Sequence, residues 1–97
     1  MDDQPTESTP GAVNRHIGIV LFPDVEELDA VGPWEVLAYW AQTFPEDGWR
    51  VCSLSASGGP VHCAKGLVVH ADYAYDDAPD LDILVYPQYH LVRGRAV

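Results

Sequence analysis

Residues 17–37 read IGIVLFPDVEELDAVGPWEVL, and this stretch decides the fold class. It begins with a short apolar run, residues 17–22, that is rich in β-branched side chains and typical of a strand buried on both faces of a parallel sheet. Pro23 and Asp24 end the run. Apolar residues then recur with a helical period over residues 25–41, where Gly32-Pro33 is expected to kink the helix or to start it afresh.

Two further strands are predicted downstream of this strand–helix unit. A turn at residues 46–48 leads into residues 49–56, which read WRVCSLSA and predict the second strand. Residues 76–81 predict a turn or a single helical turn capped by Asp76. Residues 82–86, DILVY, then predict a third buried strand.

A β-hairpin is predicted between the second and third strands. Residues 61–64 and 67–71 form its two strands, and Lys65-Gly66 forms its turn. The order strand, helix, strand, hairpin, strand therefore predicts an α/β fold with a mostly parallel sheet.

The chain divides into one domain and two tails. Residues 1–14 are polar, carry proline and glycine and show no apolar period, so we expect a disordered N-terminal tail. Residues 15–87 form the α/β domain. Residues 88–97, QYHLVRGRAV, show neither a helical stripe nor strand alternation and are interpreted as a C-terminal tail.

Charge and hydropathy exclude several classes of partner. The 97-residue chain has a net charge of −10, from 15 acidic against 5 basic residues, which argues against nucleic-acid binding. It has no apolar run long enough to span a membrane, and its acidic N-terminus is unlike a signal peptide. We therefore expect a cytoplasmic protein whose two cysteines are free thiols.

The acidic residues that follow the first strand are the candidates for chemistry, because ligand sites in open α/β sheets lie beyond the carboxyl ends of the strands. Glu26 and Glu27 are also explained by the preference for acids at a helix N-terminus. Asp29 shares a helix face with Glu26 and lies in an apolar stretch, so its carboxylate is expected to be half-buried. Asp29 is therefore the candidate catalytic residue.

The other reactive residue types predict no site. Cys52 lies within a strand and Cys63 within the hairpin, so both are interpreted as small core residues. The four histidines lack the spacing of a metal site. The glycine pair in the loop at residues 57–60 lacks a phosphate-binding pattern. No cofactor and no metal are therefore predicted.

Three stretches of the chain together resemble the ThiJ/PfpI superfamily, and in particular its isocyanide-hydratase-like branch. They are residues 17–37, the hairpin region VHCAKGLVVHADYAYDDAPDLD at residues 61–82, and ILVYP at residues 83–87. The resemblance implies a flavodoxin-like sandwich, of which this chain holds a part, and a small-molecule substrate for the full-length proteins. It also implies a cysteine nucleophile on a strand-to-helix elbow, with an acid beside it that falls on Asp29.

The chain departs from the family pattern in two places. Family members usually follow the third strand with Pro-Gly-Gly, whereas here Pro87 is followed by Gln88 and Tyr89. Neither Cys52 nor Cys63 takes the elbow position. We therefore expect a truncated N-terminal half that is inactive by itself. The alternative is a fragment of the sensor domain that is fused to the DNA-binding region of AraC-type regulators.

A half-domain of this kind is expected to leave part of its sheet uncovered. Buried parallel strands need covering layers on both faces, and the sequence offers one substantial helix. We expect one sheet face and one strand edge to meet water, so that the chain aggregates, forms a homodimer or packs loosely.

Overall fold

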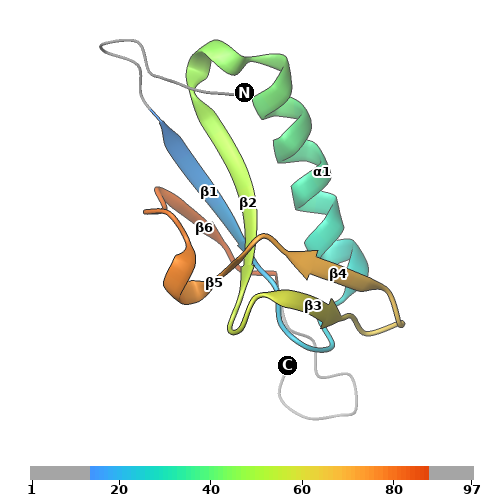
Figure 1. Cartoon of the computed structure of the whole chain (residues 1–97). Helices are drawn as coiled ribbons and strands as arrows, with labels where there is room; N and C mark the ends of the chain where they lie inside the picture. Colours follow the sequence, from blue (N-terminus) through green and yellow to red (C-terminus); the bar gives the residue numbers. More distant parts are fainter. Residues whose placement is uncertain (1–13, 88–97) are drawn as a thin grey trace.

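The computed structural model describes residues 14–87, which form one α/β unit (Figure 1). Its elements, in chain order, are β1 (Arg15–Val20), α1 (Glu27–Thr43), η1 (Pro45–Asp47), β2 (Trp49–Ser55), β3 (Gly59–His62), β4 (Val68–Ala71), β5 (Tyr73–Ala74), η2 (Tyr75–Asp77) and β6 (Ile83–Val85). The tails predicted at residues 1–14 and 88–97 lie outside the described residues, apart from Asn14.

The main sheet has four parallel strands in the order β5-β2-β1-β6, and β3 and β4 form a separate antiparallel hairpin. The apolar run at the start of the domain occupies β1, between β2 and β6, so both of its edges are paired. Ile17, Ile19 and Val20 are each at most 4% exposed, as expected for a central parallel strand. The predicted α/β class, with a mostly parallel sheet and a hairpin, is confirmed.

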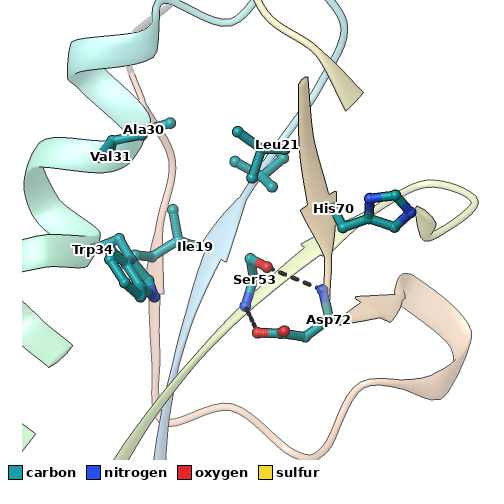
Figure 2. Close-up of a pocket in the computed structure, with 9 residues that line it drawn as sticks. Ile19, Leu21, Ala30, Val31, Trp34, Ser53, His70 and Asp72 are labelled. Atoms are coloured by element: carbon teal, nitrogen blue, oxygen red, sulfur yellow. Dashed lines mark hydrogen bonds between the residues drawn. The ribbon is translucent and has the colours of Figure 1, made fainter. Parts of the chain in front are cut away.

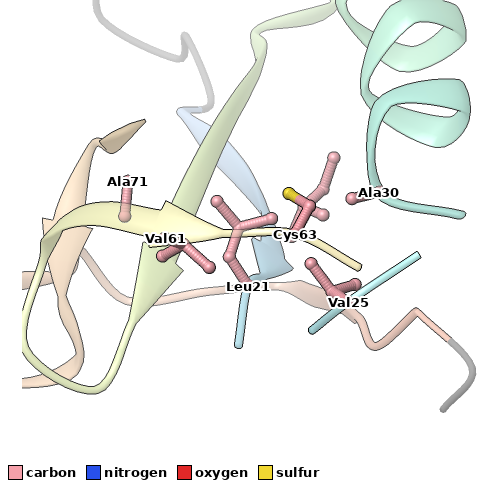
Figure 3. Close-up of a cluster of buried hydrophobic side chains, with 7 residues drawn as sticks. Leu21, Val25, Ala30, Val61, Cys63 and Ala71 are labelled. Atoms are coloured by element: carbon pink, nitrogen blue, oxygen red, sulfur yellow. The ribbon is translucent and has the colours of Figure 1, made fainter. Parts of the chain in front are cut away.

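The buried apolar cluster of the core lies where α1 and the hairpin cover the same face of the sheet (Figure 3). Along the hairpin, Val61 and Ala71 turn inward and are buried, whereas His62 and His70 turn outward. The cluster consists of Ile19, Leu21, Val25, Ala30, Val61, Cys63 and Ala71. These residues join the loop after β1, the first turn of α1 and the hairpin into one packed corner.

The opposite face of the sheet is covered better than the sequence suggests. Val20 and Leu54, which are register partners on that face, are buried at 4% and 5% exposure. Gly18 leaves room there for Leu81, because a Cβ on Gly18 would lie 2.7 Å from the Leu81 side chain. The segment before β6 thus supplies part of the cover that we expected to be missing over β1 and β2.

The helix differs from the prediction in its continuity. We expected a kink or a new start at Gly32-Pro33. The helix does not start afresh there, because α1 runs as one element from Glu27 to Thr43 with Pro33 inside it. Pro33 has no amide hydrogen to donate to the carbonyl of Asp29, so one intrahelical bond is missing there. Ala30 and Ala38, on either side of that gap, are both buried, and this packing holds the helix together.

The third strand is less buried than its sequence indicates. Within residues 14–87, β6 pairs only with β1 and lies at one end of the sheet, and Ile83 and Leu84 are 45% and 57% exposed. The prediction of a strand buried on both faces is wrong for β6, because an apolar run does not reveal whether neighbouring elements cover it.

Two smaller differences lie between the hairpin and β6. The short strand β5 was not predicted; it pairs Leu54 with Tyr73 at the other end of the sheet. A single helical turn forms as expected, as η2, but its N-cap is Ala74 and no side chain caps it. The prediction of an Asp76 cap is therefore wrong, because Asp76 lies inside the turn.

Candidate functional site

The candidate site is the corner formed by the loop after β1 and the first turn of α1. Backbone hydrogen bonds tie this loop to the hairpin: the Asp24 amide donates to the His62 carbonyl at 2.8 Å, and the Ala64 amide donates to the Val25 carbonyl at 2.9 Å. Asp24 has a φ of 68°, a left-handed conformation that aspartate adopts more readily than most residues. Backbone hydrogen bonds therefore hold this corner against the hairpin independently of the side chains.

Glu27 fastens the start of α1 to the turn of the hairpin. Its Oε2 accepts hydrogen bonds from the backbone amides of Lys65, at 2.8 Å, and Leu67, at 3.2 Å. Burial by itself would raise the pKa of the Glu27 carboxyl. The amides of Glu27, Leu67 and Lys65 and the nearby Lys65 ammonium outweigh that effect, so its pKa is lowered.

Glu26 reaches the same turn from the N-cap position of α1. The Lys65 Nζ donates to Glu26 Oε2 at 2.6 Å, and this contact is largely solvent-exposed. A hydrogen bond to Glu26 raises the pKa of Lys65. Exposed ion pairs stabilise proteins little, so the Glu27 contacts with backbone amides are the more structural of the two.

The contacts of Glu26 and Glu27 with Lys65 and Leu67 form a clasp between α1 and the hairpin, and the sequence did not reveal it. We interpreted Glu26 and Glu27 as acids placed by the helix dipole, but Glu27 and Lys65 are 38 residues apart and meet only because the hairpin folds over the helix N-terminus. No local pattern encodes such a contact. The one available signal was the lysine at the predicted turn, opposite a pair of acids.

Asp29 lies in the first turn of α1 and is half-buried, as predicted. Its Oδ2 atom has essentially no contact with solvent. The ring of Phe22, in the loop after β1, lies 5.5 Å from the ring of Tyr86, the residue that follows β6. β1 and β6 pair in parallel, so their carboxyl ends lie side by side, and the chain passes from this end of β1 into the first turn of α1, which holds Asp29.

Both cysteines are free and buried, in keeping with their interpretation as core residues. Burial, with the nearby Asp72 carboxylate, raises the pKa of Cys52. Burial, with the Glu27 and Glu26 carboxylates, raises the pKa of Cys63. An activated cysteine needs a lowered pKa, so neither thiol has the environment of a nucleophile.

The clasp makes a testable contribution to acid stability. Because the folded-state pKa of Glu27 lies below its ordinary value of 4.5, ionised Glu27 stabilises the fold above that pH, and this stabilisation is lost as the pH falls through the lowered pKa. A Glu27→Gln variant should therefore be less stable at neutral pH, and its loss of stability between pH 5 and pH 3 should be shallower. Thermal unfolding across this range measures both effects. Glu46→Gln, in the exposed η1, is the matched control, and an unchanged pH profile for Glu27→Gln would contradict the assignment.

Other kinds of site find no support in residues 14–87. In this range no three histidine, cysteine, aspartate or glutamate side chains gather as metal ligands would. None of the helices described here is long and apolar enough to cross a membrane. Gln88, Tyr89 and His90, which follow Pro87, lie outside the described residues.

Comparison with known proteins gives consistent matches. Residues 15–87 match the DJ-1/PfpI family. The isonitrile hydratase of Pseudomonas putida is 32% identical over 71 residues, a match that spans 73% of this chain and 28% of the hydratase. The chain therefore covers less than a third of that relative's length.

Solved structures share the fold. A DJ-1 superfamily protein from Agrobacterium tumefaciens superposes with a TM-score of 0.56 at 29% identity, covering 76% of this chain and 37% of that one. An AraC family transcriptional regulator from Pseudomonas putida gives a TM-score of 0.60 at 22% identity, covering 74% of this chain and 45% of the regulator. At 22% identity the second likeness concerns the fold alone.

Proposed function

This chain belongs to the DJ-1/PfpI family, and from that premise we propose that it supplies the acid-bearing half of a cysteine-dependent hydratase site. The observation that carries the proposal is Asp29, a half-buried carboxylate in the first turn of α1, at the sheet edge where β1 and β6 end. Sites in open α/β sheets lie at this edge.

The chemistry assigned to Asp29 is proton transfer. Hydration of an isonitrile adds one water across the terminal carbon and nitrogen and gives an N-substituted formamide. A cysteine thiol adds first to the terminal carbon, and water then displaces the sulfur as a thiol again. A carboxyl group beside the sulfur can take the thiol proton and deliver it to the substrate during addition.

The nucleophile itself has to come from outside these 97 residues. Cys52 and Cys63 are buried, their pKa values are raised, and Cys63 points into the apolar cluster with Leu21 and Ala30 (Figure 3). We therefore propose that the chain has no hydratase activity by itself. The free state of both thiols also supports our proposal of a cytoplasmic protein.

The likeness to a hydratase supports this function over the alternative. The P. putida isonitrile hydratase is 32% identical to this chain, whereas the AraC family regulator shares 22% of its residues over the matched region. A sensor domain of such a regulator remains the second candidate. It predicts ligand binding without turnover, and it gives Asp29 no part in proton transfer.

The absence of activity can be measured directly. The purified chain, mixed with an alkyl isonitrile, should form formamide no faster than buffer does, as followed by loss of the isonitrile stretching band. Cys52→Ser and Cys63→Ser should behave identically to the parent chain. Turnover that either substitution abolishes would overturn the structural role of that thiol.

A further inference from the structure

A pocket lies between α1 and β4 on the sheet face that the hairpin covers, and Leu21 and Ala30 of the corner beside Asp29 form part of its lining (Figure 2). This pocket has a volume of about 260 Å³. Its floor is formed by Ile19 of β1 and by Leu21 in the loop after β1, which are 1% and 3% exposed. Asp29 does not line it. The proposed hydratase chemistry, which uses the Asp29 carboxyl, therefore assigns no role to the pocket.

One wall of the pocket is apolar and aromatic. It comes from α1, where Ala30 is buried and Trp34 is 44% exposed, so the indole ring borders both the pocket and the solvent. Figure 2 shows Trp34 on the helix side of the pocket and Asp72 on the side of the hairpin. Small-molecule sites commonly combine such apolar walls with very few polar groups.

The opposite wall holds a carboxylate in a fixed orientation. Asp72 Oδ2 accepts a hydrogen bond from the Ser53 amide at 2.9 Å, and the Asp72 amide donates to Ser53 Oγ at 3.0 Å. This reciprocal pair holds the Asp72 side chain against β2. Asp72 is solvent-exposed, and its second oxygen, Oδ1, receives no hydrogen bond from the residues that the structure describes. The pocket lining includes His70 but no Lys or Arg.

We propose that this pocket binds a small organic cation, a primary amine carried on an aromatic ring by a short alkyl arm. The ammonium would pair with Asp72 Oδ1 and lie within reach of the Trp34 ring, while the ring of the ligand packs against Val31 and Val69, the other apolar side chains of the lining that are not fully buried. A dry apolar cavity of about 150 Å³ is enough to hold benzene, so 260 Å³ suits one ring and a two-carbon arm. The net charge of −10 disfavours an anion at the same place.

A titration with three ligands of one shape tests the proposal. ¹H–¹⁵N spectra of the 97-residue chain would be recorded with 2-phenylethylamine, 2-phenylethanol and 3-phenylpropionate. The amine is expected to shift the amide signals of Ser53, Asp72 and Trp34, with a dissociation constant on the order of a millimolar. The alcohol should bind about fivefold more weakly, and the carboxylate more weakly still.

Substitutions separate the ion pair from the apolar contact. Asp72→Asn keeps an oxygen for the Ser53 amide but removes the charge, so it should reduce amine binding about fivefold and leave alcohol binding unchanged. Asp76→Asn, an exposed acid in η2 that does not line the pocket, is the matched control and should have no effect.

Four results would overturn the proposal: no shifts with the amine, shifts centred on Asp29, equal affinity for the amine and the alcohol, or equal losses in Asp72→Asn and Asp76→Asn. Signals of Trp34 and Val31 that move with protein concentration, but not with amine, would mean that a second copy of the chain covers the pocket, and they would also overturn it. These outcomes do not depend on hydratase activity, so the two proposals can fail separately.

Discussion

An Asp29→Asn substitution is expected to lower isonitrile hydration by at least about 100-fold in a chimera that joins residues 15–87 of this chain to the remaining part of the P. putida hydratase. The chimera supplies a nucleophile that Cys52 and Cys63 cannot provide. Asparagine has nearly the shape of aspartate but carries no transferable carboxyl proton, so the loss should appear in kcat. The measurement is the rate of formamide formation at saturating isonitrile.

Two control variants make this result specific. Asp47→Asn removes an exposed carboxylate from η1 and should leave the rate within about twofold of the parent. Asp29→Glu restores the carboxyl on a longer arm and should recover part of the rate. If Asp29→Asn and Asp47→Asn are equally active in a chimera that hydrates isonitriles, the assignment of proton transfer to Asp29 is wrong. Retained ligand binding without any turnover in the parent chimera would favour the sensor alternative.

The sequence predicted the fold wherever local patterns carry the information. Apolar runs predict β1 and β2, and the turn at Lys65-Gly66 predicts the hairpin. The order of these elements along the chain then predicts a parallel sheet. The burial of β6 was mispredicted because it depends on whether other elements pack beside that strand. The cover that Leu81 gives to Gly18 was missed for the same reason.

In the candidate site, too, features with a local pattern could be predicted, and contacts between distant segments could not. The half-buried position of Asp29 could be predicted, because apolar residues flank it on a helix whose period is visible. The attachment of Glu27 to the hairpin, and the pairing of Ser53 with Asp72, could not. Both are contacts between segments that are distant in sequence, and both involve backbone amides, which leave no trace in residue identity.

The exposed edge of the sheet leads to the second large effect: the isolated chain is expected to sediment as a dimer or larger species at micromolar concentration. β6 pairs with β1 on one side, and its other side has no strand partner among residues 14–87. Leu84 and Tyr86 are 57% and 64% exposed at this edge. An unpaired strand with apolar side chains is a template for pairing with another chain. Two β6 strands can therefore extend the sheet across two copies.

A charge placed on that edge should prevent the association. Leu84→Lys is expected to weaken self-association at least about tenfold, because a lysine at the edge of a sheet must give up hydration to pair with a second copy. Val36→Lys is the matched control, since Val36 is 66% exposed on α1, away from β6, and should leave association unchanged. Sedimentation velocity from about 5 to 100 µM separates the outcomes. A parent chain that stays monomeric would show that β6 does not mediate self-association. Dissociation caused by Val36→Lys would show instead that the interface lies on α1.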